Sequence, residues 1–335
     1  MSITLDNLEQ CLMCNTDFCK LDPLWPKISI QSLFLQNSDD SITDLKIFSH
    51  SALGNLKHLH LDLETKTDTI LYILENCNHL ETLIVLTWDF DMVMKKPSST
   101  ALGNLSRLSK LSWKSHIGDP LSLFNHFYIQ KPLNLENLGL WNPSNQLTKT
   151  LSKLSPNLVS LELNISLETT SSDLSATSLE FALISNLVID ADFTRRMKFS
   201  VAKAIADNMN HLAVLRIKDT LELTQSSLLY LLNTRGKSLK ELEVTLRNID
   251  KVNDRILTTM SIMCPNLEIL TLLCSGWEVS DVTLEIFSKK TRIKFIHDCF
   301  FTRHMLDLLR SLNISVFYTI LEVAERENTH RVIVN

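Results

Sequence analysis

Leucine and isoleucine alternate with polar residues in short stretches that recur along the 335-residue chain. In the clearest of them, residues 264–272 read C-P-N-L-E-I-L-T-L, so that Leu267, Leu270 and Leu272 follow the spacing L-x-x-L-x-L. A period of two predicts a strand with one apolar face, and the preceding Pro-Asn predicts a turn. An apolar run of helical type, residues 254–263, comes just before it. The pattern therefore predicts a helix, a turn and a half-buried strand in that order.

The same spacing recurs at a nearly constant interval. Its first apolar positions are Ile30, Leu56, Leu80, Leu108, Leu135, Leu158, Ile184, Leu212, Leu239, Leu267 and Ile293. The intervals of 23 to 28 residues fall in the range of about 20–29 residues that is typical of leucine-rich repeats. Because the core of a repeat array grows with every unit, a chain of this length need not divide into two globular domains.

The segments between these strands have apolar residues at helical spacing. Helices are predicted at residues 69–76 (after Asp68 as N-cap), 199–209, 226–232 and 254–263. Strands pack about 4.8 Å apart and helices about 8–10 Å apart, so the helices belong on the outside of an arc. The predicted fold is α/β, a leucine-rich repeat solenoid (horseshoe) of about eleven repeats with a concave parallel sheet and convex outer helices.

Three regions follow from this pattern. Residues 1–29 precede the first repeat and are predicted to form a helical segment or cap, with Leu5, Leu8 and Leu12 at helical spacing. Residues 30–300 contain the repeats. Residues 301–335 are predicted to form a C-terminal cap with a helix over 301–309 and short strands at 314–317 and 332–334, because the end of a solenoid would otherwise expose leucines.

Composition narrows the classes of function. Six widely spaced glycines cannot form G-x-G-x-x-G, a P-loop or a G-x-S-x-G elbow, which disfavours an enzyme of those types. A net charge of −5 with mixed signs favours neither a nucleic-acid nor a membrane partner. Without a signal-like N-terminus, the seven cysteines indicate reduced thiols of a cytoplasmic or nuclear protein.

The cysteine-containing stretches carry a family resemblance. Residues 77–83 (C-N-H-L-E-T-L), 155–161 (S-P-N-L-V-S-L) and 264–270 (C-P-N-L-E-I-L) resemble the cysteine-containing leucine-rich repeats of F-box proteins with a ribonuclease-inhibitor-like fold. In that family the repeats bind a substrate, and an N-terminal F-box binds the Skp-type adaptor of a cullin ubiquitin ligase. Here the 29 residues before the first repeat are too few for a complete F-box. Residues 11–25, which contain Cys11, Cys14 and Cys19 and end in Leu24-Trp25, resemble only the end of one, so we expect the F-box to be missing or truncated in this sequence.

Two groups of residues have spacings that metal ions use. Cys11, Cys14 and Cys19 are spaced as three zinc thiolates, but no fourth ligand is near in the sequence, and structural thiols are favoured. His58 and His60 are two apart on one strand, a geometry that a solvated sheet face explains as well as a metal pair does. No metal site and no cofactor is predicted.

The candidate binding residues lie on the concave face, at the third, fifth and seventh positions of each repeat, which point away from the leucines. This face is expected to be polar, yet it also includes apolar and aromatic residues, as protein-binding surfaces do. The last repeat, counted from Ile293, adds Phe295 and His297 to the face. The predicted partner-binding residues are His60, Ile84, Ser112, Trp141, Glu162, Val188, Arg216, Glu243, Thr271 and Leu273.

The sequence therefore predicts a non-catalytic scaffold for protein–protein recognition. The family resemblance implies the substrate receptor of an SCF-type ubiquitin ligase, with a protein substrate on the concave face and a Skp-type adaptor and cullin as further partners. The alternative is a stand-alone leucine-rich repeat regulator or inhibitor with no ligase role.

Overall fold

A computed structural model describes most of the repeat region. The residues described are 10–14, 31–36, 54–62, 67–87, 98–115, 124, 132–141, 143–165, 176–178, 180–191, 195–218, 221–246, 252–274, 277–297, 303–312 and 314–318. The chain divides into two compact units, residues 1–164 and residues 165–335, here called the N-terminal and C-terminal units.

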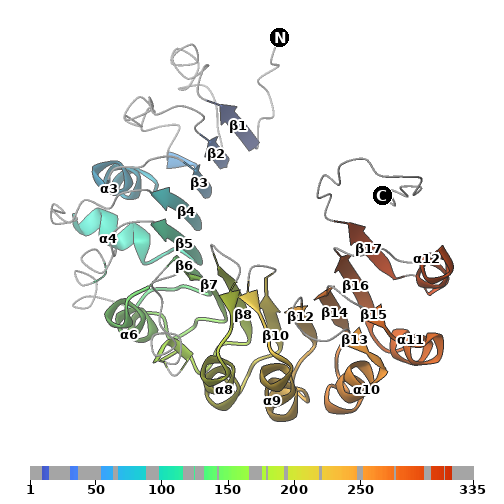
Figure 1. The fold of residues 1–335 in the computed structure, drawn as a ribbon. Helices are drawn as coiled ribbons and strands as arrows, with labels where there is room; N and C mark the ends of the chain where they lie inside the picture. Colours follow the sequence, from blue (N-terminus) through green and yellow to red (C-terminus); the bar gives the residue numbers. More distant parts are fainter. Residues whose placement is uncertain are drawn as a thin grey trace, which may run out of the picture. The chain divides into compact units, whose positions relative to one another are not determined.

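The N-terminal unit is built on a parallel sheet in which each strand pairs with the next one in the sequence (Figure 1). Its strands are β1 (Gln10–Cys14), β2 (Ser32–Gln36), β3 (His58–Asp62), β4 (Thr82–Thr87), β5 (Lys110–Ser115), β6 (Asn137–Trp141) and β7 (Ser160–Ile165). The helices α3 (Thr67–Asn76), α4 (Ser99–Leu105) and α6 (Asn145–Leu154) lie on one face of this sheet.

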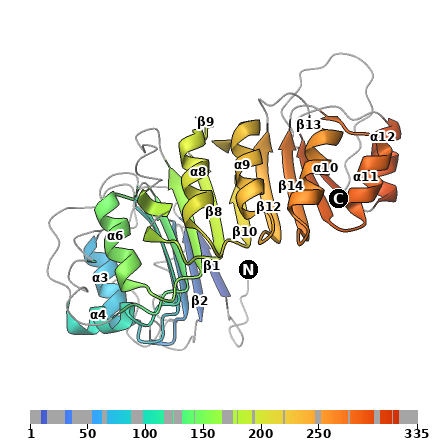
Figure 2. The same ribbon diagram turned by 90° about the horizontal axis from the view of Figure 1, so that it is seen from below.

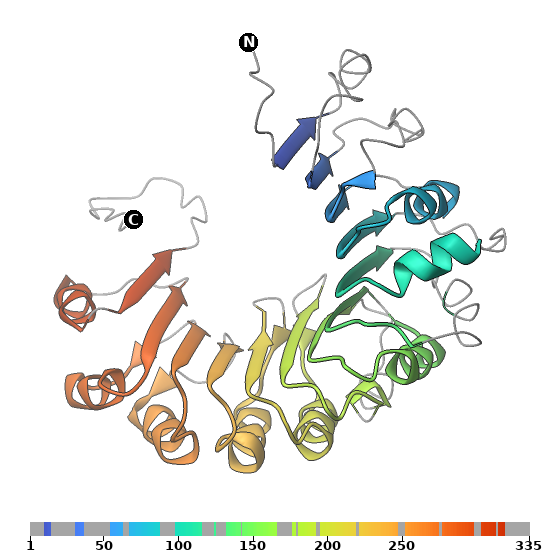
Figure 3. The ribbon, with the colours of Figure 1, turned by 180° about the vertical axis from the view of Figure 1, so that it is seen from behind.

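The C-terminal unit repeats the arrangement, and its helices stand side by side in Figure 2. Its main parallel strands are β8 (Asn186–Ala191), β10 (Val214–Ile217), β12 (Glu241–Leu246), β14 (Ile269–Cys274), β16 (Arg292–His297) and β17 (Ser315–Tyr318). The helices are α8 (Phe199–Asn208), α9 (Gln225–Arg235), α10 (Asp254–Met263), α11 (Asp281–Ser288) and α12 (Arg303–Ser311), all on the same side of the strands (Figure 3). Short strands follow some main strands, namely β9 (Arg195–Arg196), β11 (Leu221–Glu222), β13 (Val252–Asn253) and β15 (Trp277–Glu278).

The leucine rows form the core between sheet and helices. In β7 and β8, buried and half-exposed side chains alternate strictly along the strand. Neighbouring strands are in register, so that Leu59 lies opposite Leu83 and Leu83 opposite Leu111, and all three are buried. Parallel strands, one leucine-lined face and helices covering that face confirm the predicted leucine-rich repeat solenoid.

A backbone rung joins successive repeats where each strand begins. The Gln31 carbonyl accepts the N–H groups of both Lys57 and His58, at 2.8 and 2.9 Å, and the Lys57 carbonyl accepts those of Glu81 and Thr82 in the next repeat. In the C-terminal unit the carbonyls of Ser185, Ala213 and Lys240 each accept two such groups. A carbonyl of one repeat thus accepts the N–H groups at the start of the next strand, and these hydrogen bonds fix the register between the two strands.

The helices end in a turn that the cysteine motif encodes. The Cys264 N–H donates to the Met260 carbonyl, and its own carbonyl accepts from Leu267, which brings the chain back to the sheet. The same two bonds form at Cys77, Ser155, Met209 and Gly236. The cysteine is therefore one of several residues that fit this buried turn.

One prediction about the ends of the repeat region is wrong, and another is confirmed in part. Residues 10–14 form strand β1, which pairs with β2, so the helix predicted through Leu12 is wrong there. Leu5 and Leu8 lie outside the described residues. At the other end, the predicted helix and strand are present as α12 and β17, and β17 pairs with β16 and extends the sheet. Residues 332–334 lie outside the described residues.

The register predicted for the last repeat is also wrong. Ile293 lies opposite Leu270, which is the fourth position of its repeat and not the first. Phe295 therefore lies opposite the core residue Leu272, and His297 lies opposite Cys274. A shift of three residues, an odd number, moves both from the predicted face to the leucine rows.

Gly236 occupies a helix-end turn in which there is no room for a side chain. A Cβ atom there would lie 2.4 Å from the Leu232 oxygen, 2.5 Å from the Met263 oxygen and 2.9 Å from the Cys264 sulfur. We expect Gly236→Ala to lower the free energy of unfolding by about 1–3 kcal/mol, as overpacking does, in a urea titration.

The matched control is Gly103→Ala in α4, where an added Cβ meets nothing within 4 Å. This change should leave stability unchanged or raise it by up to about 1 kcal/mol, because alanine favours a helix over glycine. Equal effects of the two substitutions would contradict the close packing of successive repeats at Gly236.

Candidate partner-binding face

The face of each sheet opposite the helices, here called the open face, is formed by the third, fifth and seventh repeat positions. In the N-terminal unit one row across it runs through Phe34, His60, Ile84, Ser112, Gly139 and Glu162. His60 packs edge-on against Phe34, with ring centroids 4.2 Å apart. Ser112 is buried because Gly139 lies directly beside it, at a distance that leaves no space for a Cβ on the glycine.

Trp141 lies at the last position of β6, opposite Asn164 of β7. It is half-buried, as are His60, Ile84 and Glu162, so these four predicted residues present part of their side chains on the open face of one unit. His60 and Ile84 lie directly opposite each other on β3 and β4, as predicted from the repeat spacing.

In the C-terminal unit the corresponding row runs through Val188, Arg216, Glu243 and Thr271. Arg216 makes two parallel hydrogen bonds to Glu241, from Nε to Oε1 at 2.9 Å and from an Nη atom to Oε2 at 3.1 Å. These bonds, with the charges of Glu241 and Glu243, raise the pKa of the Arg216 guanidinium above its usual value. The guanidinium is therefore held in a fixed plane on the open face.

A second ion pair and three apolar residues surround this pair. Lys218 Nζ lies 3.4 Å from Asp190 Oδ2 on the neighbouring strand. Val188, Val214 and Ile269 are half-exposed. Val188 lies directly opposite Arg216 on β8, and Val214 lies two residues before Arg216 on β10. Ile269 lies opposite Glu241. Fixed charges beside partly exposed aliphatic groups are the features of a protein-recognition surface.

Three predicted binding residues offer a partner little surface. Ser112, Thr271 and Leu273 are only 5%, 7% and 4% exposed, although they lie at open-face positions. The spacing of a repeat determines which way a side chain points but not what covers it. That each of the ten residues contacts a partner stays a prediction.

The structure places the candidate metal ligands on strands. Cys11 lies opposite the core residue Leu33 and Cys14 opposite Gln36, so the two positions belong to different rows of the sheet, and Cys19 lies outside the described residues. His58 and His60 share one strand, and His60 is engaged with Phe34. Within the described part of the chain, no three His, Cys, Asp or Glu residues are grouped so as to hold a metal ion.

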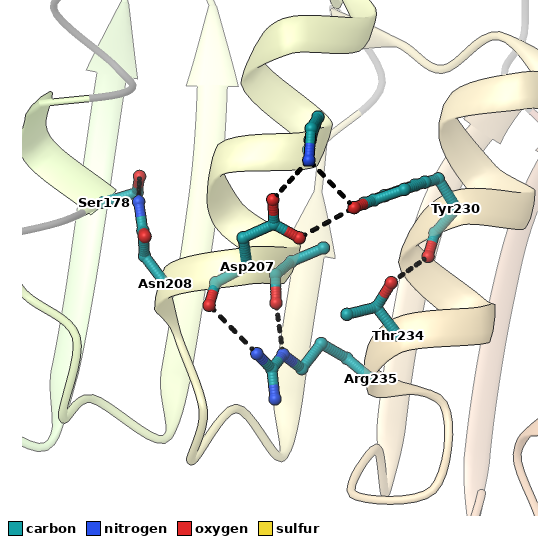
Figure 4. A network of polar contacts seen from close by, with 8 residues as sticks. Ser178, Asp207, Asn208, Tyr230, Thr234 and Arg235 are labelled. Carbon is teal, nitrogen blue, oxygen red and sulfur yellow. Dashed lines mark hydrogen bonds and ion pairs between the residues drawn. The ribbon is translucent and has the colours of Figure 1, made fainter.

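A polar cluster on the helical side, which the sequence did not reveal, joins α8 to α9 (Figure 4). Lys203 Nζ donates to Asp207 Oδ2 at 2.6 Å and to the Tyr230 hydroxyl at 3.1 Å, and that hydroxyl donates to Asp207 Oδ1 at 2.8 Å. Arg235 donates to the carbonyls of Ala206 and Asp207 and to Asn210 Oδ1.

The hydrogen bonds of this cluster favour the charged forms of Lys203 and Asp207. The bond from Lys203, followed by that from Tyr230, lowers the pKa of the Asp207 carboxyl, and the bond to Asp207 raises the pKa of Lys203 to about 12. Phe199 packs edge-on against Tyr230, with centroids 5.3 Å apart. The cluster contains hydrogen bonds from one helix to the other and therefore links two successive repeats. It is here called the polar strap.

Comparisons with known proteins identify no family for this chain. No family model matches the sequence, and no curated protein is similar to it in sequence. The yeast Rad7 and Elc1 complex contains a chain with 14% identity and a TM-score of 0.44, over 83% of this chain and 78% of that one. The Toll–Spatzle complex of Drosophila contains one with 11% identity and a TM-score of 0.37, over 84% of this chain and 45% of that one.

Among the described residues, no helix combines the length and the apolar character that crossing a membrane requires.

The thiols of Cys77 and Cys264 are buried, and burial raises the pKa of each to about 12. The thiolate is the reactive species, so both residues should resist brief iodoacetamide labelling of the folded protein at pH 8 and react after unfolding in guanidinium. Peptide mass spectrometry measures this directly. Labelling of Cys264 as fast in the folded as in the unfolded protein would contradict its packing role.

Proposed function

We propose that the protein recognises another protein on the open face of its repeats and is not an enzyme. The observation that carries this proposal is the surface around the Arg216–Glu241 pair, where a fixed bidentate ion pair lies among the half-exposed Val188, Val214 and Ile269. Aliphatic surface supplies affinity when it is desolvated, and fixed charges select the partner and its orientation.

The more specific form of the proposal is a substrate receptor of an SCF-type ubiquitin ligase. It is supported by the resemblance of residues 77–83, 155–161 and 264–270 to the cysteine-containing repeats of F-box leucine-rich repeat proteins. A Skp-type adaptor and a cullin would then bind through the N-terminal segment, whose residues 15–30 lie outside the described residues. The proposed compartment is the cytoplasm or nucleus.

The ligase role is tested by affinity purification of the tagged full-length protein with quantitative mass spectrometry. A substrate receptor should recover a Skp-type adaptor and a cullin in near-equal amounts. Recovery of neither, alongside a stable different partner, would contradict the ligase role and favour a stand-alone regulator or inhibitor.

The open-face role is tested by Trp141→Ala combined with Arg216→Ala. A buried Trp or Arg contact is typically worth 2 kcal/mol or more, so the affinity for the purified partner should fall by about 30-fold or more. Isothermal titration calorimetry of this variant, with Lys149→Ala on the exposed side of α6 as the matched control, gives the comparison.

The folded state of the double variant is checked by its unfolding midpoint, because truncating Arg216 leaves Glu241 unpaired. The Skp-type adaptor should be recovered to the same extent with the double variant as with the wild type, since it binds elsewhere in this proposal. A folded double variant that binds the partner with wild-type affinity would show that the open face is not the binding surface.

A further inference from the structure

The helical side of the C-terminal unit has an apolar patch that the open-face function does not use. Ile262 on α10 is 74% exposed, and Val282 and Ile286 on α11 are 66% and 56% exposed. Val282 and Ile286 are four residues apart and therefore lie on the same side of α11. Large aliphatic side chains exposed on adjacent helices mark an interaction site more often than a solvated surface.

The neighbouring helix pair shows where these residues point. Counted from the N-cap of each helix, Ile262 is the ninth residue after Asn253, just as Asp207 is the ninth after Lys198. Ile286 is the sixth after Ser280, just as Tyr230 is the sixth after Thr224. Thr258 is the fifth residue after Asn253, just as Lys203 is the fifth after Lys198.

The three groups of the polar strap between α8 and α9 are thus replaced by Ile, Thr and Ile between α10 and α11. Asp207 and Tyr230 hold each other across their helix pair, whereas Ile262 and Ile286 at the same places remain mostly exposed. The two helices are still tied at their N-terminal ends, where the Ser280 N–H donates to Asp254 Oδ1 at 2.7 Å. The exposed apolar side chains therefore lie along the seam between α10 and α11.

The charges around this apolar seam are separated along the helix direction. Carboxylates gather towards the N-terminal ends of both helices, where Asp254, Glu278 and Asp281 lie with one basic residue, Arg255, and Glu285 follows in the middle of α11. Two exposed lysines, Lys289 and Lys290, follow the end of α11. A ligand that matches this distribution has basic groups at one end and acidic groups at the other.

We propose that the seam between α10 and α11 is a second docking site, for an amphipathic helix of a partner protein that lies antiparallel to α10. Its apolar face covers Ile262, Val282 and Ile286, its basic C-terminal part lies beside Asp281 and Glu285, and its acidic N-terminal part lies beside Lys289 and Lys290. The ten-residue α10 spans about 15 Å, so the docked helix has about three turns. This site is independent of the open face.

The test uses two designed helical peptides of about 15 residues with the same leucine stripe. One has glutamates in its N-terminal half and lysines in its C-terminal half, and the other has these charges exchanged. In fluorescence anisotropy with the full-length protein, the first peptide should bind saturably and about tenfold more tightly than the second, and added salt should reduce the difference.

The double substitution Ile262→Ser with Ile286→Ser should weaken the first peptide at least about tenfold, since each side chain loses an apolar contact. Val159→Ser, a half-exposed apolar residue of the N-terminal unit, is the control and should change nothing. Because these side chains are exposed, unfolding midpoints should be preserved. Glu285→Lys should reduce the preference between the two peptides.

Three results would overturn the proposal. The first is the absence of saturable binding by either peptide, and the second is binding that the double substitution leaves unchanged. The third is a concentration-dependent dimer in sedimentation that the double substitution abolishes, which would assign the patch to a second copy of this chain. None of these results affects the open-face test, because that test alters neither α10 nor α11.

Discussion

The structure depends on the backbone rung at the start of β3 to β7, β10, β12 and β14. One carbonyl, such as that of Glu81 or Ser109, accepts two consecutive N–H groups of the next repeat, which leaves no freedom in the register between them. With the register fixed, every leucine row stacks in line and the third, fifth and seventh repeat positions face the open side. The rung thus determines both the core and the candidate binding face, although its atoms belong to neither.

The same constraint explains which parts of the fold could be predicted from the sequence. The L-x-x-L-x-L spacing located the main strands β2 to β8, β10, β12 and β14, because most of their buried positions hold leucine or isoleucine, with Val85, Trp113 and Val244 as exceptions. It failed at β16, where Lys290 stands at the first position. There the rung itself changes, since the Thr291 N–H donates to the Phe287 carbonyl of α11 and its hydroxyl donates to the Leu267 carbonyl at 3.0 Å.

The sequence predicted which face of the sheet holds the candidate site. It did not predict which side chains on that face are covered or paired. Alternation along a strand indicates which side chains face away from the leucines, yet it does not indicate that Leu273 is covered or that Arg216 pairs with Glu241 of the next repeat. The pair joins positions 25 residues apart in sequence, and only the register of β10 against β12 shows that the two side chains meet. The contacts between the outer helices could not be predicted from the repeat. Equivalent positions on these helices hold chemically unrelated residues, such as Asp207 and Ile262.

In the proposed function, a protein partner contacts the open face of the C-terminal unit. The most direct measurement is site-specific photo-crosslinking, with p-benzoylphenylalanine placed at Val188 or Val214 and, as a control, at Lys149. The account predicts that the same partner protein is captured from both open-face positions and not from Lys149. Capture from Lys149 but from neither valine would contradict it.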